Sequence, residues 1–236
     1  MANTVRTTPI IALDVPTADA AMRVVESLGD RCRFYKIGSE LFTAAGPNIV
    51  TRVRDAGCRV FLDLKLYDIP NTVRGAARSA ARLGVRLLTV HASGGVPMIE
   101  AAVEGGGDAT SILAVTVLTS FDDASLKDAT GRPEVVASNE VVRLADLASR
   151  ARAHGIVCSG AEAAAVRAKF ADTLAVLVPG IRMAGSAAHD QRRVVTPAEA
   201  SAAGARYIVV GRAVTAAPDP RAAMDLVLSE LQSVAV

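Results

Sequence analysis

The chain has 236 residues, of which 51% are hydrophobic and 21% charged. This composition is typical of a globular protein, and the length suits a single catalytic domain over residues 1–236. Its 26 Lys and Arg residues nearly balance 24 Asp and Glu residues, and a net charge of +2 gives no general attraction to nucleic acid or to an anionic membrane. No stretch reaches the roughly 18 consecutive apolar residues that span a bilayer.

The cysteines indicate a reducing compartment. Cys32, Cys58 and Cys158 lie far apart, and no pair has metal-ligand spacing. A disulfide framework is not typical of a chain of this length. The first residues lack the long apolar run and the cleavage pattern of a secretion signal. We therefore expect a cytoplasmic protein, and we expect no metal site.

Short β-branched apolar runs alternate along the chain with longer Ala-rich segments that have helical spacing. Several of these runs are apolar at nearly every position, as in strands that are covered on both faces. Eight strands are predicted in chain order, over 10–15, 33–39, 59–66, 85–92, 111–119, 156–159, 174–178 and 206–211.

Helix start and stop signals frame the Ala-rich segments between the strands. Pro70 occupies the position typical of a first helical residue, and Gly84 follows the last turn of the same segment. Helices are predicted in chain order over 18–28, 71–83, 97–104 and 197–203, the last two with the same proline-first, glycine-last pattern.

Alternation of strands with helices predicts an α/β fold with parallel strands and right-handed crossovers. Eight such units can close into a (β/α)8 TIM barrel, whereas open doubly wound sheets more often stop at about six strands. Two segments interrupt this alternation of strands and helices. Residues 121–138 are polar and are expected to form a long loop after the fifth strand. Residues 183–195, with Gly185 and Ser186, are expected to form a mobile lid after the seventh strand.

The third predicted strand carries the most informative residues. Strand side chains alternate between faces, so Asp63 and Lys65 share one face and the leucines beside them share the other. With the leucines toward the helices, the charged pair points into the barrel near its C-terminal mouth, where active sites of this fold lie. Asp68 follows in the next loop. Nearby carboxylates favour the ammonium form of a confined lysine, which makes it a positioned proton donor.

A salt-bridge network that only closes the barrel is the structural alternative for these residues. Buried ion pairs stabilise proteins poorly, and this cluster lies at the C-terminal end of a strand. Both features favour a functional role for Asp63 and Lys65.

Motifs at nearly every predicted strand end resemble those of the orotidine 5'-phosphate decarboxylase family, over about residues 8 to 220. In order they are ALD (12–14), YKIGS (35–39), DLKLYDIPNT (63–72), VHASGG (90–95), VTVLTS (115–120), VPGIR (178–182), DQRR (190–193) and VGR (210–212). The resemblance implies a barrel of the ribulose-phosphate-binding type. It also implies conversion of orotidine 5'-phosphate (OMP) to uridine 5'-phosphate (UMP) and CO2, with neither metal nor other cofactor.

The resemblance also assigns catalytic roles. It makes Lys65 the residue that stabilises the carbanion developing at C6 of the pyrimidine and then protonates it. Asp63 would lie beside the departing carboxylate. Lys36 and Asp68 would complete an alternating Lys-Asp-Lys-Asp array. Such a preorganised array suits charge stabilisation because it need not reorganise during the reaction.

Further contacts with substrate are expected at the strand ends. Arg212 can form charge-assisted hydrogen bonds to phosphoryl oxygens, since loops after the seventh and eighth strands form the usual phosphate site of this fold. By resemblance Asp14 accepts a hydrogen bond from a ribose hydroxyl. The resemblance makes Thr119 the substrate contact and Ser120 a possible partner of the pyrimidine, and strand register decides which hydroxyl points inward. The predicted substrate-binding residues are Asp14, Lys36, Asp63, Ile69, Thr72, Thr119, Ser120, Pro179, Arg182, Gln191, Gly211 and Arg212.

The family resemblance implies a homodimer in which Asp68, Ile69 and Thr72 reach the partner's site. Two other functions stay open. A decarboxylase of keto-sugar phosphates from the same superfamily would share the Asp-x-Lys-x-x-Asp pattern but use Mg2+, and in those enzymes the position of Lys36 is typically acidic. A catalytically silent phosphoribosyl-binding protein could share the fold, although it would have little reason to surround one cavity with four charged residues.

Overall fold

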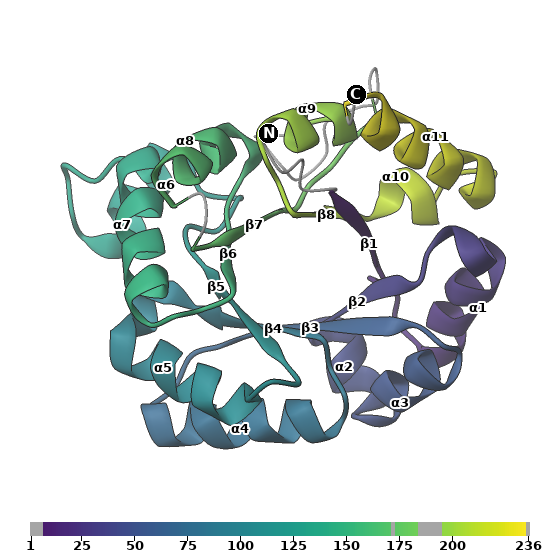
Figure 1. Cartoon of the computed structure of the whole chain (residues 1–236), viewed down its shortest axis with the longest axis horizontal. Coiled ribbons are helices and arrows are strands. Elements are labelled where there is room, and N and C mark those ends of the chain that lie inside the picture. Colours follow the sequence, from purple (N-terminus) through teal and green to yellow (C-terminus); the bar gives the residue numbers. More distant parts are fainter. Residues whose placement is uncertain (1–6, 171–172, 184–194, 235–236) are drawn as a thin grey trace.

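The computed structural model describes residues 7–170, 173–183 and 195–234. Eight parallel strands close into one barrel in sequence order, with β8 pairing with β1. The helices surround this barrel (Figure 1). Each strand overlaps a predicted one, so the (β/α)8 fold is confirmed. The strands are β1 Thr8–Ala12, β2 Phe34–Gly38, β3 Arg59–Leu66, β4 Leu87–His91, β5 Ser111–Val115, β6 Gly155–Val157, β7 Ala175–Val178 and β8 Tyr207–Val210.

The apolar strand residues divide between two cores. Phe34 and Tyr35 are neighbours on β2 and both are buried, yet Phe34 belongs to the cluster inside the barrel and Tyr35 to the cluster between strands and helices. This follows from the alternation of side chains along a strand. It also explains why the strand segments are apolar on nearly every residue, because both faces are covered.

The helical layer follows the predicted start signals with one exception. Thr17 accepts a hydrogen bond from the Ala20 N–H group at the start of α1, and α4 begins at Pro70 as predicted. In contrast, α5 begins at Gly95, so Pro97 is its third residue rather than its first. Proline is tolerated there because N–H groups in the first turn have no intrahelical partner. The main helices are α1 Ala18–Leu28, α2 Ser39–Ala45, α3 Asn48–Asp55, α4 Pro70–Arg82, α5 Gly95–Gly106, α7 Ala137–Arg150, α8 Gly160–Phe170, α9 Pro197–Ala202, α10 Arg212–Thr215 and α11 Pro220–Ser233.

The expected long loop over 121–138 is wrong. A further helix, α6 (Asp123–Thr130), occupies its centre, and α7 begins before its end. Asp122 and Ser125 form a reciprocal capping box at the start of α6. Only Leu126 of this helix is buried, so the segment lacks the apolar periodicity that marks an amphipathic helix. Local capping, rather than burial of an apolar face, defines this element.

The expected lid over 183–195 falls almost wholly outside the described residues, and so do Gly185, Ser186 and Gln191. At its borders, Ile181 and Val195 form a parallel β-bridge beyond the end of β7. Both ends of the intervening segment are therefore anchored at the C-terminal mouth of the barrel.

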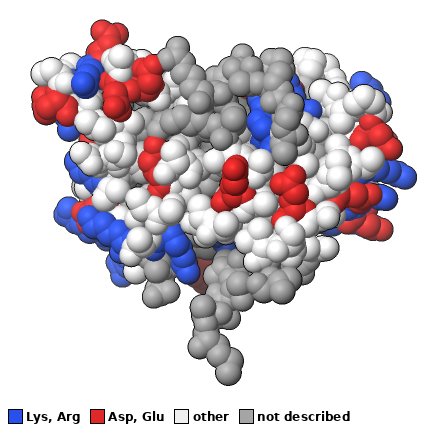
Figure 2. Space-filling model, turned by 90° about the horizontal axis from the view of Figure 1, so that it is seen from above, with Lys and Arg blue, Asp and Glu red and all other residues white. Residues whose placement is uncertain are grey.

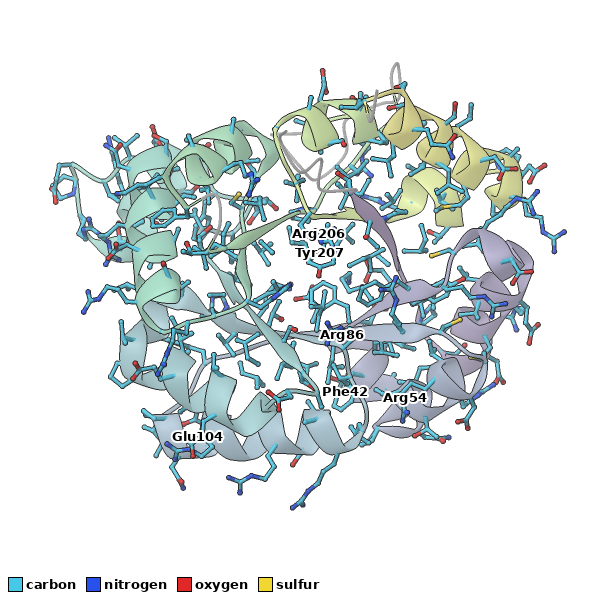
Figure 3. The ribbon with its side chains drawn as sticks, in the orientation of Figure 1. Phe42, Arg54, Arg86, Glu104, Arg206 and Tyr207 are labelled. Atoms are coloured by element: carbon cyan, nitrogen blue, oxygen red, sulfur yellow. The ribbon has the colours of Figure 1, made fainter. Side chains whose placement is uncertain are left out.

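The surface has no dominant sign of charge on the face seen in Figure 2, where acidic and basic side chains are interspersed. This pattern agrees with the small net charge of the chain. Within the described ranges, none of the helices combines the length and the apolar character needed to cross a bilayer.

Candidate active site

A cavity of about 390 Å³ opens at the C-terminal ends of the strands, where barrel active sites lie. Its volume falls within the range of about 300–1,000 Å³ that is usual for small-molecule sites. Apolar residues from inside the barrel form its base, among them Phe61, Val115 and Val157, and charged residues stand above them. The cavity can therefore enclose an apolar or aromatic ring while charged groups contact its substituents.

Four side chains form an alternating charged row along one wall of this cavity: Asp14, Lys36, Asp63 and Lys65. The Nζ atom of Lys36 lies 2.7 Å from Oδ1 of Asp14 and 3.9 Å from Oδ2 of Asp63. The Nζ atom of Lys65 donates to both carboxylate oxygens of Asp63, each at 2.9 Å. The fold thus brings together three of the predicted catalytic residues, which come from neighbouring strands β2 and β3.

Burial differs along the charged row. The side chains of Lys36 and Asp63 are 11% and 13% exposed, whereas that of Lys65 is 37% exposed. The inner pair is therefore shielded from water, and Lys65 reaches the open part of the cavity. Coulombic interactions are stronger at such sites than in water, so the row can act strongly on a charge that develops beside Lys65.

Gly38, at the end of β2, provides the space for this row. A Cβ atom at Gly38 would lie 3.1 Å from Nζ of Lys36 and 3.4 Å from Oδ1 of Asp14. Any larger residue would crowd this ion pair. This glycine was not among the predicted site residues, although it lies two residues after Lys36 in the YKIGS motif.

The end of β3 departs from regular strand geometry. Its register against β4 shifts between Leu62 and Leu66, and within this bulge Lys65 has a φ of 50°, one of two positive values found at non-glycine residues of the described chain. A left-handed lysine is uncommon, and such residues cluster at functional sites. The leucines still pack against the helical layer, so the predicted division of faces is confirmed.

His91 ends β4 beside the charged row. Its ring packs edge-on against Tyr67, with ring centroids 5.8 Å apart. Burial lowers the pKa of His91, and the positive charge of Lys65 lowers it further. The imidazole is therefore neutral at neutral pH and adds no competing positive charge next to Lys65.

The side of the cavity formed by the ends of β7 and β8 is cationic. Pro179, Gly180 and Arg182 from the end of β7, with Gly211 and Arg212 from the end of β8, line it. The Nε atom of Arg182 is buried and has no hydrogen-bond partner among the described residues. Since an unpaired buried donor is costly, this wall suits an anion that supplies the missing acceptor.

The remaining predicted residues separate into two groups. Thr119 lines the cavity, whereas Ser120 is exposed and is absent from the described lining. Asp68, Ile69 and Thr72 are all exposed and lie outside the cavity of their own chain. Among the described residues, the last three therefore take no part in the cavity of their own chain.

No group of three or more His, Cys, Asp or Glu side chains suited to a metal ion occurs in the part of the chain that the structure describes. The carboxylates of the charged row instead contact ammonium groups.

Comparisons with known proteins agree with this geometry. The family model described as orotidine 5'-phosphate decarboxylase / HUMPS family matches residues 7–227. The orotidine 5'-phosphate decarboxylase of Anaeromyxobacter sp. (strain K) is 55% identical over 215 residues, which are 90% of this chain and 92% of that protein. That of Cutibacterium acnes is 50% identical over 220 residues, covering 92% and 93%. The crystal structure of the Lactobacillus acidophilus enzyme of this name has a TM-score of 0.84 at 35% identity, covering 96% of this chain and 99% of that one.

Proposed function

The chain belongs to the orotidine 5'-phosphate decarboxylase / HUMPS family, and we propose that it converts OMP to UMP and CO2 with no cofactor, as the last step of de novo pyrimidine nucleotide synthesis. The charged row of Asp14, Lys36, Asp63 and Lys65 is the observation that supports this proposal most directly. It lies on the wall of a cavity whose apolar base suits a pyrimidine ring and whose side at the ends of β7 and β8 suits a phosphate.

The proposed reaction needs one proton donor and no electron acceptor. The bond between C6 and the carboxylate breaks, CO2 leaves, and the electron pair of that bond stays on C6. The ammonium group of Lys65 stabilises this developing negative charge and then transfers a proton to C6. Asp63 holds that ammonium group in place through two hydrogen bonds. Water then returns a proton to Lys65.

Lys36 favours this reaction over a Mg2+-dependent one on keto-sugar phosphates. Its Nζ atom lies between the carboxylates of Asp14 and Asp63, where a divalent cation would need to bind them. A buried ammonium group at this position repels a second cation. The charged row therefore suits a substrate that brings a negative charge to Lys65.

The other contacts follow from the shape of the cavity. We propose that Asp14 binds a ribose hydroxyl and that Thr119 contacts the pyrimidine. Pro179, Arg182, Gly211 and Arg212, with Gln191, would bind the phosphate and the adjoining part of the nucleotide. The buried Nε atom of Arg182, which has no acceptor among the described residues, supports an anion there.

The phosphate contacts predict how an arginine variant behaves. Arg212→Ala should lower kcat/KM for OMP by about 100-fold, because charge-assisted hydrogen bonds to the phosphate are lost. The same variant should leave the slow turnover of orotidine, which has no phosphate, unchanged. Steady-state kinetics on both substrates, with the exposed Arg150→Ala as the control, would test this prediction. An equal loss on orotidine would contradict phosphate binding by Arg212.

A direct assay tests the proposed function. The loss of OMP would be followed by ultraviolet absorbance with purified protein, with and without EDTA. Conversion to UMP that EDTA does not affect is the expected result. If EDTA abolishes activity, keto-sugar phosphates with Mg2+ become the substrates to test. Tight binding of UMP by folded protein without turnover of OMP would instead indicate a silent binding protein.

We also propose a homodimer in which Asp68, Ile69 and Thr72 of each chain enter the partner's site. Support comes from the exposure of Tyr67 and Ile69, which are 64% and 67% exposed beside the cavity mouth. Apolar side chains exposed in this way are typical of a contact surface. A cytoplasmic location remains our expectation, and the free thiols of all three cysteines fit it.

A further inference from the structure

Thr89, on β4, contacts two of the proposed catalytic residues at once. Its side chain is fully buried at 0% exposure. The hydroxyl donates a hydrogen bond to Oδ1 of Asp63 at 2.8 Å. The same oxygen accepts a hydrogen bond from the backbone N–H group of Lys65 at 2.9 Å. One hydroxyl therefore joins the carboxylate of Asp63 to the backbone of Lys65.

The bulge at the end of β3 explains why the hydroxyl of Thr89 is needed. Leu62 pairs with Leu88, and the next pair is Leu66 with Val90, so three residues of β3 stand opposite Thr89 alone. The N–H group of Lys65 thus lacks the regular ladder partner, and a buried N–H group requires an acceptor. The hydroxyl of Thr89 supplies it at the one residue of β3 that has a left-handed backbone.

We propose that Thr89 is a positioning residue that fixes the relative placement of the Asp63 carboxylate and the Lys65 ammonium group. It is absent from the described lining of the cavity, so it acts through these two residues and not by touching substrate. By holding the backbone at Lys65, it directs the side chain toward the open cavity. By bonding Oδ1 of Asp63, it fixes the carboxylate that receives the Lys65 ammonium group. This inference rests on the proposed function.

Thr89→Val and Thr89→Ser separate the hydroxyl from the shape of the side chain. Valine keeps the branched shape and removes the oxygen, whereas serine keeps the oxygen. Thr89→Val is expected to lower kcat for OMP by about 100-fold, as a small misplacement of reacting groups can do. Its affinity for UMP should stay at the wild-type value, because Thr89 contacts neither the base nor the phosphate. Thr89→Ser should restore kcat to near the wild-type value.

Thr110→Val is the matched control. Thr110 is also buried and also uses its hydroxyl in a hydrogen bond, to the backbone oxygen of Val85 at 2.6 Å, but it precedes β5 at the opposite end of the barrel. The Thr110→Val variant should lose about as much thermal stability as Thr89→Val and keep the wild-type kcat. If Thr89→Val does not fold, Thr89→Ala can be compared with Thr89→Ser, because these two variants also differ only in the hydroxyl group.

The possible outcomes distinguish this inference from the proposed function. Wild-type protein that is folded but inactive on OMP would remove the proposed function and this inference with it. If the wild-type protein is active and Thr89→Val has the same kcat, the proposed function stands and the positioning role of Thr89 is overturned. A parallel loss of kcat and UMP affinity, or failure of serine to restore kcat, would make Thr89 a structural residue and also overturn the proposal.

Discussion

Lys65→Ala is expected to lower kcat for OMP decarboxylation by about 10⁴-fold or more. Two contributions are lost together: proton transfer to C6, typically worth about 10²–10⁴-fold, and electrostatic stabilisation of the carbanion, worth about 10²–10³-fold. Because Lys65 reaches the open cavity while Asp63 and Lys36 are shielded, neither neighbour can replace it. Single-turnover kinetics with OMP would measure the loss. Lys127→Ala, an exposed lysine on α6, is the control that should keep full activity.

The backbone at Lys65 allows a second test of the same position. Its φ of 50° disfavours alanine but not glycine. The free energy of unfolding of Lys65→Gly should therefore exceed that of Lys65→Ala by about 1 kcal/mol. Both variants should be equally inactive. Inactivity in both variants despite different stability would exclude misfolding as the cause. Substantial turnover by either variant would contradict the assignment of Lys65 as the proton donor.

The barrel could be predicted from the sequence because each strand has to be apolar on both faces. Apolar segments such as the one that forms β4 differ clearly from the Ala-rich helical segments. Because there are eight of them, they predict a sheet that closes into a barrel. The placement of the charged row was predictable for a related reason. Charged residues within an otherwise apolar strand, such as Asp63 and Lys65, have few places to point except the mouth of the barrel.

Other features depend on contacts that the sequence pattern does not display. The helix α6 was missed because its capping box defines it while only Leu126 is buried. Strict alternation placed Lys65 on the correct face, but no local pattern revealed the bulge that turns its backbone. Thr89 is one of two polar residues of β4, and only the fold shows that its hydroxyl bonds the carboxylate of Asp63.

Asp68 presents the opposite situation, because the sequence resemblance assigns it a role that a single chain cannot display. Its carboxylate accepts a hydrogen bond from the N–H group of Ile69, at the exposed start of the loop before α4. If Asp68 acts in the partner's site, each site combines Lys65 of one chain with Asp68 of the other. Lys65→Ala and Asp68→Ala are then each expected to be inactive as homodimers.

Mixing the two inactive variants should therefore restore activity. In a heterodimer, the Asp68→Ala chain keeps its own Lys65 and receives Asp68 from the Lys65→Ala chain, so one of the two sites is intact. Random exchange of subunits places half of the chains in heterodimers, and about a quarter of all sites should become active. Activity would be measured after co-refolding at equal concentration, with each variant alone as the control. A mixture as inactive as its components would show that Asp68 does not complete the partner's site, because only a site shared between two chains gathers both defects in one site of the heterodimer and leaves the other site intact.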